Sequence, residues 1–144
     1  MADNFTDSAE QGIALFIFNK TTYAELAMTD GTGKDTLYMS LHTASPGEAG
    51  TVVTNECTVT GYVRKSMART NGVWTVASGS ASNAALVSFA PISAGSETAT
   101  YAGLSTVVSG AGALIAYAAL TTNLALGVGV VPTIQIGGVT FAII

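Results

Sequence analysis

The chain has very few of the residues from which most enzyme and metal sites are built. Its 144 residues include one cysteine, Cys57, and one histidine, His42. A single cysteine excludes an intramolecular disulfide and a zinc site made of paired cysteines. The Thr-rich neighbourhood of Cys57 is typical of a small strand residue that is buried or half-buried. Glu56 beside it disfavours the thiolate that a reactive cysteine needs.

The single histidine and the scattered acids do not form a recognisable catalytic pattern. We interpret His42 as a hydrogen-bonded residue at a strand end, because no Ser-His-Asp or Cys-His arrangement surrounds it in the sequence. The segment Asp30–Asp35 lacks the acidic spacing of an EF-hand and the span of a P-loop, so we interpret it as a glycine turn. A pair of glycosidase acids would have to come from the following loop acids, none of which has a sequence setting that indicates burial: Asp30, Asp35, Glu48, Glu56 and Glu97. We therefore expect no enzyme activity, no catalytic residue, no cofactor and no metal site.

Charge is also scarce. Charged residues make up 10% of the chain, against about 25% in typical soluble domains. The formal net charge is −4, which disfavours binding to nucleic acid through its phosphates. Arg64, Lys65 and Arg69 form the one basic cluster, and we interpret it as a strand face turned toward solvent or toward a partner protein. Small polar residues take the place of charges, as is typical of a β-protein whose surfaces do not all face water.

The C-terminal third carries no charge at all. No Asp, Glu, Lys or Arg follows Glu97. Residues 111–131 are long and apolar enough to suggest a transmembrane helix. Against this alternative, Thr121-Thr122-Asn123 predicts a polar turn inside the run, and no Lys or Arg flanks it. Gly137-Gly138 further on is suited to a tight hairpin turn. We therefore favour uncharged strands that pack in the core and against partner subunits, and we expect no membrane contact.

The spacing of apolar residues predicts one helix followed by strands. Residues 5–19 have a helical pattern, with Asp7 or Ser8 as the N-terminal cap and a broad apolar face. Such a short helix is not stable alone in water, so it must pack on a sheet or on a neighbour. Residues 29–36 predict a loop and residues 37–42 a strand. Further short strands are predicted at 57–68, 73–77, 84–89, 101–108, 113–120, 128–136 and 139–143.

These elements predict a mainly β fold. We expect an antiparallel β-sandwich, jelly-roll or Ig-like, with a short N-terminal helix. The length suits one domain, so we expect residues 1–144 to form a single β-rich domain. Within it, residues 1–36 form the N-terminal helix or arm and residues 37–144 the sandwich. The start, MADNFTDSAE, lacks the basic and apolar regions of a secretory signal. We expect the protein to be assembled in the host cytoplasm.

Four blocks of sequence, in order, resemble a family of small structural proteins of tailed bacteriophages. The first is LYMSLHTASPGE at residues 37–48, and the second is GYVRK at residues 61–65. The third is SNAALVSFAP at residues 82–91, and the fourth is IAYAALTT at residues 115–122. Residues 100–107 depart from the family pattern, since they are smaller and less charged than its usual stretch after the Phe-Pro strand. The resemblance implies a virion component.

Small phage β-domains of this type include capsid decoration subunits and tail-fibre proteins. The main hypothesis is a capsid decoration (cement) protein that forms a homotrimer and stabilises the shell. It is favoured by the small size, the absence of a fibrous repeat and the uncharged C-terminal third, which suits an obligate interface. The alternative is a tail-fibre or baseplate-associated structural or receptor-binding protein. A small hydrolase that uses His42 is a third hypothesis.

The expected partners are copies of the chain itself and the phage major capsid protein or tail proteins. Candidate assembly contacts are the apolar residues Phe16, Ile17 and Phe18 of the predicted helix. The basic cluster of Arg64, Lys65 and Arg69 completes the set. We expect the protein to be located in the virion.

Overall fold

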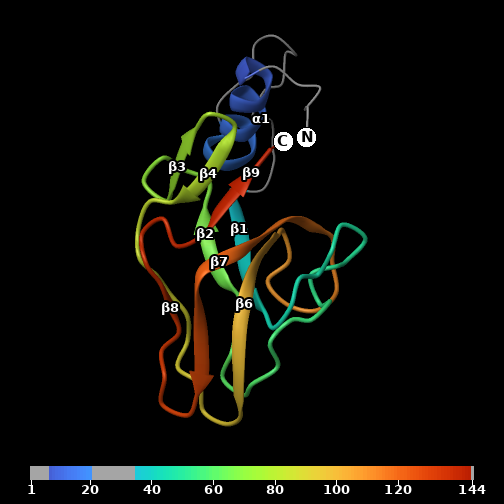
Figure 1. Ribbon diagram of the computed structural model, residues 1–144, viewed down its shortest axis with the longest axis vertical. Helices are drawn as coiled ribbons and strands as arrows, with labels where there is room; N and C mark the ends of the chain where they lie inside the picture. Colours follow the sequence, from blue (N-terminus) through green and yellow to red (C-terminus); the bar gives the residue numbers. More distant parts are fainter. Residues whose placement is uncertain (1–6, 21–34, 144) are drawn as a thin grey trace.

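The computed structural model describes residues 7–20 and 35–143, to which every structural statement here refers. The molecule is elongated, with its helix at one end and the longest strands reaching toward the other (Figure 1). The described elements, in chain order, are α1 (Asp7–Asn19), β1 (Thr36–His42), β2 (Lys65–Ala68), β3 (Trp74–Ala77), β4 (Ser80–Asn83), β5 (Val87–Ser88), β6 (Ser96–Ser105), β7 (Leu114–Gly127), β8 (Thr133–Ile134) and β9 (Thr140–Ala142).

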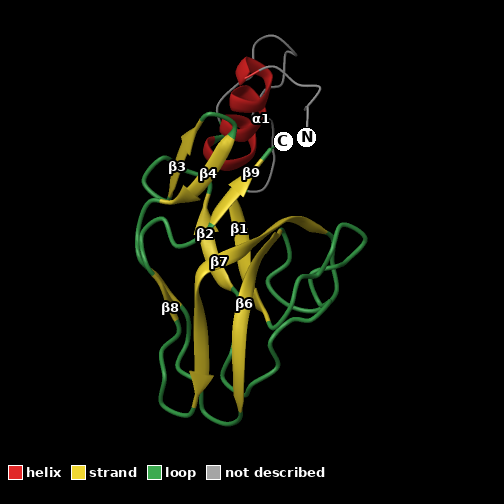
Figure 2. Ribbon diagram, in the orientation of Figure 1, coloured by secondary structure: helices red, strands yellow, loops and turns green. Residues whose placement is uncertain are grey.

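The strands form three antiparallel sheets (Figure 2). The largest has four strands in the order β2-β1-β6-β7, a second has three in the order β3-β4-β9, and β5 pairs with β8. Every described strand pair is antiparallel. The prediction of a mainly β, antiparallel fold with a short N-terminal helix is therefore confirmed, and the sheets pack in a sandwich-like arrangement.

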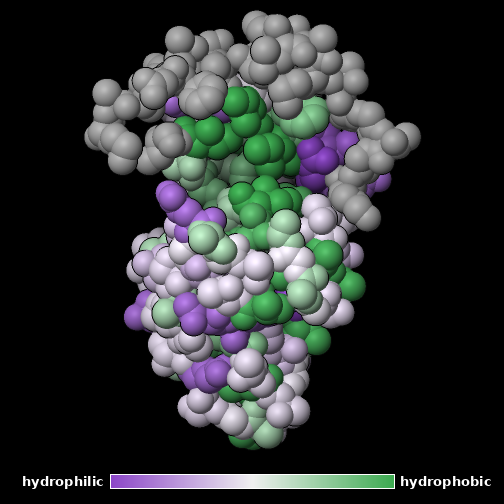
Figure 3. Space-filling view, turned by 90° about the vertical axis from the view of Figure 1, so that its right-hand side faces the viewer, coloured by the Kyte–Doolittle hydropathy of each residue, from purple (hydrophilic) through white to green (hydrophobic). Residues whose placement is uncertain are grey.

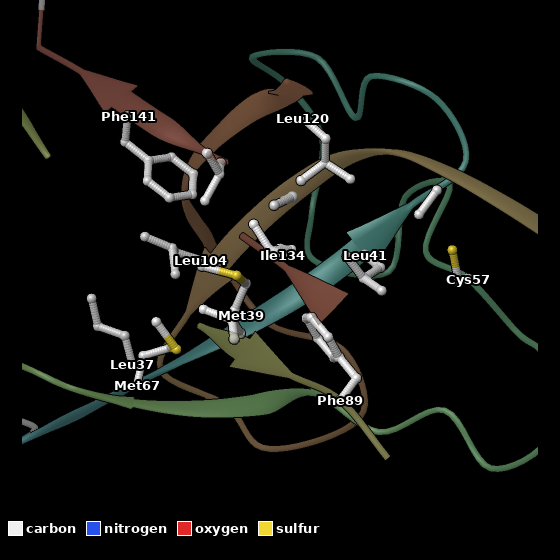
Figure 4. Packing of buried hydrophobic residues seen from close by; sticks show 14 of the residues in the cluster. Leu37, Met39, Leu41, Cys57, Met67, Phe89, Leu104, Leu120, Ile134 and Phe141 are labelled. Carbon is white, nitrogen blue, oxygen red and sulfur yellow. The ribbon is translucent and has the colours of Figure 1, made fainter. Parts of the chain in front are cut away.

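One continuous core joins the helix to all three sheets. Figure 4 shows side chains from separate strands pointing into it, among them Leu41, Leu104, Ile134 and Phe141. On the helix side, the Phe18 ring lies 4.9 Å from the Trp74 ring in an edge-on arrangement. Such aromatic pairs add to the free energy gained by burying their surface. The short helix is thus stabilised by packing on β3 and β4.

Strand β1 is buried on both faces, and this positions the candidate site. Leu37, Met39 and Leu41 alternate along one face and enter the core. Ser40 and His42 point to the opposite face and are also fully buried. The loop before β2 and the loop before β7 cover this polar side of the strand.

The interpretation of Thr121-Thr122-Asn123 as a turn is wrong. These residues lie within β7, which runs unbroken from Leu114 to Gly127. They are exposed, and the pairing of β7 with β6 shifts register there, between Ala99 and Tyr101 of β6. An edge strand tolerates polar residues on its open side, and threonine favours strands. The run that suggested a membrane span is therefore largely a strand. No helix in the described ranges has the length and hydropathy to cross a membrane.

Other predicted boundaries need correction as well. Of the strand predicted at residues 57–68, only Lys65–Ala68 is a strand, because side-chain bonds rather than a neighbouring strand hold the preceding loop. A turn at Gly137 is confirmed, and its φ of 69° favours glycine. The strands on either side of it do not form a hairpin, since β8 pairs with β5 and β9 with β4.

Strand β6 begins five residues before its predicted start, several other strands are shorter than predicted, and one strand was missed. The segments 84–89 and 128–136 contain only the two-residue strands β5 and β8. The missed strand is β4, Ser80–Asn83, whose small polar residues carry little apolar signal. The helix matches its prediction over Asp7–Asn19. Residues 29–34 of the predicted loop, and the first six residues, lie outside the described ranges.

Phe18→Ala tests whether the helix belongs to the core. We expect a loss of about 3–5 kcal/mol in the free energy of unfolding, because a fully buried aromatic ring leaves a cavity. Phe16→Ala is the matched control. Its ring is half-buried and lies under the Arg69 guanidinium, 5.9 Å from the ring centroid, an interaction of about 0.5–1 kcal/mol. Urea denaturation measures both; equal losses would show that Phe18 does not anchor the helix.

Candidate functional site

The densest group of polar side chains lies between the polar face of β1 and the loops that cover it. The loops comprise residues 43–64 and 106–113. Their backbones are tied to the sheet at a few points, such as the bond from the Cys57 N–H to the Leu41 carbonyl, 2.9 Å long. Side chains supply most of the remaining ties. We refer to this group as the loop-anchoring network: Ser40, His42, Glu56, Tyr62 and Arg64.

A bidentate ion pair is the centre of the network. Arg64 donates from Nε to Oε1 of Glu56 and from a terminal nitrogen to Oε2, each over 2.7 Å. The two side chains are only 3% and 13% exposed. The same guanidinium donates to the carbonyls of Val107 and Gly110, at 3.1 Å and 2.8 Å. Four charge-assisted bonds thus join both covering loops through one side chain.

Tyr62 connects this ion pair to β1. Its hydroxyl donates to Oε1 of Glu56 over 3.1 Å and accepts the N–H of Leu41 over 2.8 Å. Burial raises the pKa of Tyr62 well above its usual value, with a further rise from the Glu56 carboxylate. The hydroxyl therefore stays protonated and keeps both bonds.

His42 is held by both of its ring nitrogens. Nδ1 lies 2.8 Å from the Thr54 carbonyl, and Nε2 lies 2.8 Å from Oγ of Ser40. Because a carbonyl only accepts, Nδ1 carries the hydrogen, and Nε2 of the neutral ring accepts the Ser40 hydroxyl. Gly103 lies opposite Ser40 on β6. A Cβ there would come within 2.6 Å of Nε2, so only glycine leaves room for the His42–Ser40 pair.

The pKa of His42 is held below its usual 6.5, chiefly because burial disfavours the charged ring. The nearby Arg64 lowers it further, whereas the Thr54 carbonyl and the Glu56 carboxylate oppose the shift. A buried, neutral histidine with both nitrogens occupied does not present a free base to a substrate. The interpretation of His42 as a hydrogen-bonded residue at the end of a strand is confirmed.

A second carboxylate holds the loop at its other side. Glu97 accepts the backbone N–H groups of Thr58 and Val59, at 2.7 Å and 3.3 Å, and the Thr58 hydroxyl. Cys57 lies between this carboxylate and Glu56. Burial, with smaller contributions from the two carboxylates, raises the pKa of its thiol to about 12. The thiol is buried and protonated, as the sequence indicated.

The chemistry of the network is structural. Its acids accept bonds from the chain itself. No group of three or more potential metal ligands occurs among residues 7–20 and 35–143. The hollow next to the network, about 240 Å³ in volume, is lined by Glu56, Tyr62 and Arg64, whose polar atoms are already bonded to one another. The arrangement stabilises long loops on a small sheet. The Ser40 hydroxyl and His42 do form a hydrogen-bonded pair, but both side chains are fully buried and bonded within the chain.

The three basic candidates for assembly contacts lie in different settings. Arg64 is buried in the network. Arg69 donates hydrogen bonds to the backbone carbonyls of Phe16 and Ile17, at the C-terminal end of α1, where a positive charge is stabilised by the helix dipole. Lys65 is half-buried at the start of β2. The fold does not gather them on one face, and their role in assembly stays a prediction.

The three apolar candidates are also separated. Phe18 is 2% exposed in the core, whereas Phe16 and Ile17 are half-buried beside Arg69. The structure thus brings Phe16, Ile17 and Arg69 together at one end of the helix. Their contact with another subunit stays a prediction. Sequence reasoning missed Glu56 and Tyr62 as partners of Arg64, because no periodic pattern links these loop positions.

The fold and the network define a small β-rich structural domain whose buried polar side chains bind its own loops. Comparison with known families assigns it more closely. A family model described as podophage GP4 fiber I protein gp80 matches residues 4–142. The chain belongs to this family. It is therefore a structural component of a tailed-phage virion. The resemblance of the four sequence blocks implied the same.

No curated protein matches the chain. The family description names a fibre and gives no support to a capsid decoration protein, which was our main hypothesis. The alternative, a tail-fibre or baseplate-associated protein, fits that description better. The physical signal behind the capsid hypothesis was the uncharged C-terminal third, and such a surface suits any obligate interface, in a shell or in a fibre.

Arg64→Met tests the ion pair. We expect a loss of about 3–5 kcal/mol in the free energy of unfolding, because the Glu56 carboxylate stays buried without its partner. Lys65→Met, one residue along the chain, is the matched control and should change stability by less than about 0.5 kcal/mol. Urea denaturation measures both. Similar effects of the two substitutions would show that the ion pair does not hold the loops.

The single histidine predicts a pH dependence of stability. Below its ordinary pKa of 6.5, His42 is protonated in the unfolded chain and resists protonation in the folded one. The unfolded state therefore binds more protons, and stability falls as the pH is lowered below 6.5, by up to about 1.4 kcal/mol per pH unit. Unfolding in urea between about pH 7.5 and about pH 5.5, which brackets the ordinary value, measures this slope. His42→Gln should be less stable at neutral pH and lack the slope, whereas an unchanged slope would contradict the assignment.

Proposed function

We propose that this chain is a tail-fibre-associated structural subunit of the phage and has no enzymatic activity. The family description carries this proposal, since it names a fibre protein. The loop-anchoring network supports it, because the polar groups that an enzyme would turn toward a substrate are bonded to the chain's own loops. Its partners are copies of itself, as a homotrimer, and neighbouring tail proteins. Nucleic acid and membrane are not among them.

The surface composition supports a role in assembly. After Glu97 the exposed side chains include Ile115, Val128 and Ile136, the last two 71% and 69% exposed. Val130 and Val131 are exposed in the same loop as Val128. No charged residue lies within this part of the chain. A surface of this kind is expected where contact with another protein removes it from water. Part of the uncharged third thus fills the core through Leu126 and Phe141, and the rest is available to partners.

The location is tested on intact virions that contain this chain. Quantitative mass spectrometry should give a copy number far below that of the major capsid protein, and immunogold labelling should mark the tail. A copy number comparable with that of the capsid subunit, with label over the shell, would instead support the capsid decoration hypothesis. Light scattering of the purified chain measures its mass and tests the homotrimer separately.

A further inference from the structure

The edge of the four-stranded sheet is open along part of β7. At its beginning the chain is tied by Thr51, which bridges to Ala113 just before the strand. Further along, Leu120 bridges to Val139, and the Thr121 N–H donates to the Gly138 carbonyl over 2.9 Å. Between these two ties, Leu114 and residues 116–119 pair with β6 on one side only, and the register with β6 shifts at Ile115. On the other side no backbone partner occurs among the residues that the structure describes.

This open edge faces the open edge of a second sheet. Strand β9 pairs with β4 through residues 140–142. On its other side, within the described ranges, backbone ties to β7 occur only at Gly138 and Val139, just before the strand. From the Val139 bridge the two strands separate. A hollow of about 420 Å³ lies between Leu114–Tyr117 of β7 and the C-terminal segment made of Phe141 and Ala142 of β9 and Ile143 after it. Ile17 and Phe18 of the helix line it as well. On the face shown in Figure 3, hydrophobic residues gather in the upper half of the molecule.

Edge strands in soluble proteins are usually protected from pairing by charges, prolines or bulges. Residues 114–119, LIAYAA, contain no charge and no proline. Their one irregularity is the register shift at Ile115, so the edge is regular from Ala116 to Ala119. Ile115 is 43% exposed. Three of the six side chains are alanine, so a neighbouring backbone can approach closely. The combination of open backbone groups and an uncharged hollow is what β-strand addition uses, with main-chain bonds for affinity and side-chain pockets for specificity.

We propose that this hollow binds one extended segment of another protein chain, which adds a strand between β7 and β9. Since the open stretch has ties at both ends and β9 on its far side, a single strand fits and the edge of a second folded sheet does not. Six residues of strand span roughly 20 Å. The open stretch of β7 is longer than that of β9, so pairing with β7 sets the direction of the added strand. We expect it to run antiparallel to β7, because antiparallel pairing is slightly more stable than parallel pairing.

The charged residue at the hollow determines which kind of segment it can bind. Glu48 is the one charged residue among those that line it, and it is exposed at the rim formed with Gly47 and Gly50. That rim precedes Thr51 and so lies at the Leu114 end of the open stretch. A segment antiparallel to β7 has its C-terminal end there. The structure therefore assigns an uncharged segment with alternating apolar residues that ends in a lysine or arginine beside Glu48.

The experiment uses the full chain and a blocked synthetic peptide of alternating threonine and valine that ends in lysine. Amide NMR should show shifts and slower hydrogen exchange at residues 115–119 and 140–142 as the peptide is added. A peptide that ends in glutamate instead should bind about 2- to 5-fold more weakly, which corresponds to a surface charge effect. The lysine peptide with its central residue replaced by proline, which lacks a backbone N–H, should not bind.

Glu48→Lys should reverse the preference and favour the glutamate peptide, whereas Thr75→Lys, on the exposed side of β3, should leave it unchanged. The proposal fails if residues 115–119 do not respond to the peptide, or if the proline peptide binds equally well. It also fails if Glu48→Lys does not reverse the preference. Protection of these amides without peptide, rising with protein concentration, would assign the edge to a second copy and overturn it.

The inference rests on the proposed function in one respect, since it supposes that the chain assembles with other proteins. Its test does not depend on where in the virion the chain lies. Peptide binding with a copy number typical of the capsid would leave the strand-addition site intact and refute the fibre location. Absence of peptide binding together with a tail location would refute the strand-addition site and leave the fibre location intact.

Discussion

The two bonds between Glu56 and Arg64 hold together a fold that has unusually long loops for its sheets. Without them, the covers of the polar face of β1 would depend on a few backbone bonds such as that between Cys57 and Leu41. The same guanidinium also reaches the loop before β7 through the Val107 carbonyl. One buried charge pair therefore replaces the strand pairing that these loops lack. Removing one partner of the pair leaves a buried charge and is costly. Replacing both partners with apolar residues of matching shape can be neutral for stability.

Strand β1 explains why the histidine and the glycine opposite it stand where they do. Its apolar face belongs to the core. From Ser40 to His42 its polar face belongs to the network, so this half of the strand is buried on both faces. His42 and Ser40 bond to each other in the space that Gly103 leaves. The single histidine thus has a structural role, and its lowered pKa results from burial.

The uncharged third of the chain divides between the core and an open edge. Leu120, Leu126 and Phe141 complete the packing of all three sheets. Along residues 114–119 the backbone of β7 stays open toward β9, beside an apolar hollow. A structural component of a virion is joined to other proteins, and a strand edge without charge is suited to such pairing. The same edge in a freely diffusing protein would favour aggregation.

The sequence by itself determined the class of fold, the helix at Asp7–Asn19 and the absence of a paired-cysteine site, because these follow from local periodicity and residue counts. It also indicated that His42 is structural. Only the tertiary structure decided that Thr121-Thr122-Asn123 continue a strand and that β8 and β9 join different sheets. Likewise, the pairing of Arg64 with Glu56 joins positions in a loop without periodicity. Such contacts depend on which distant segments the core brings together, and the local sequence around each residue does not determine that.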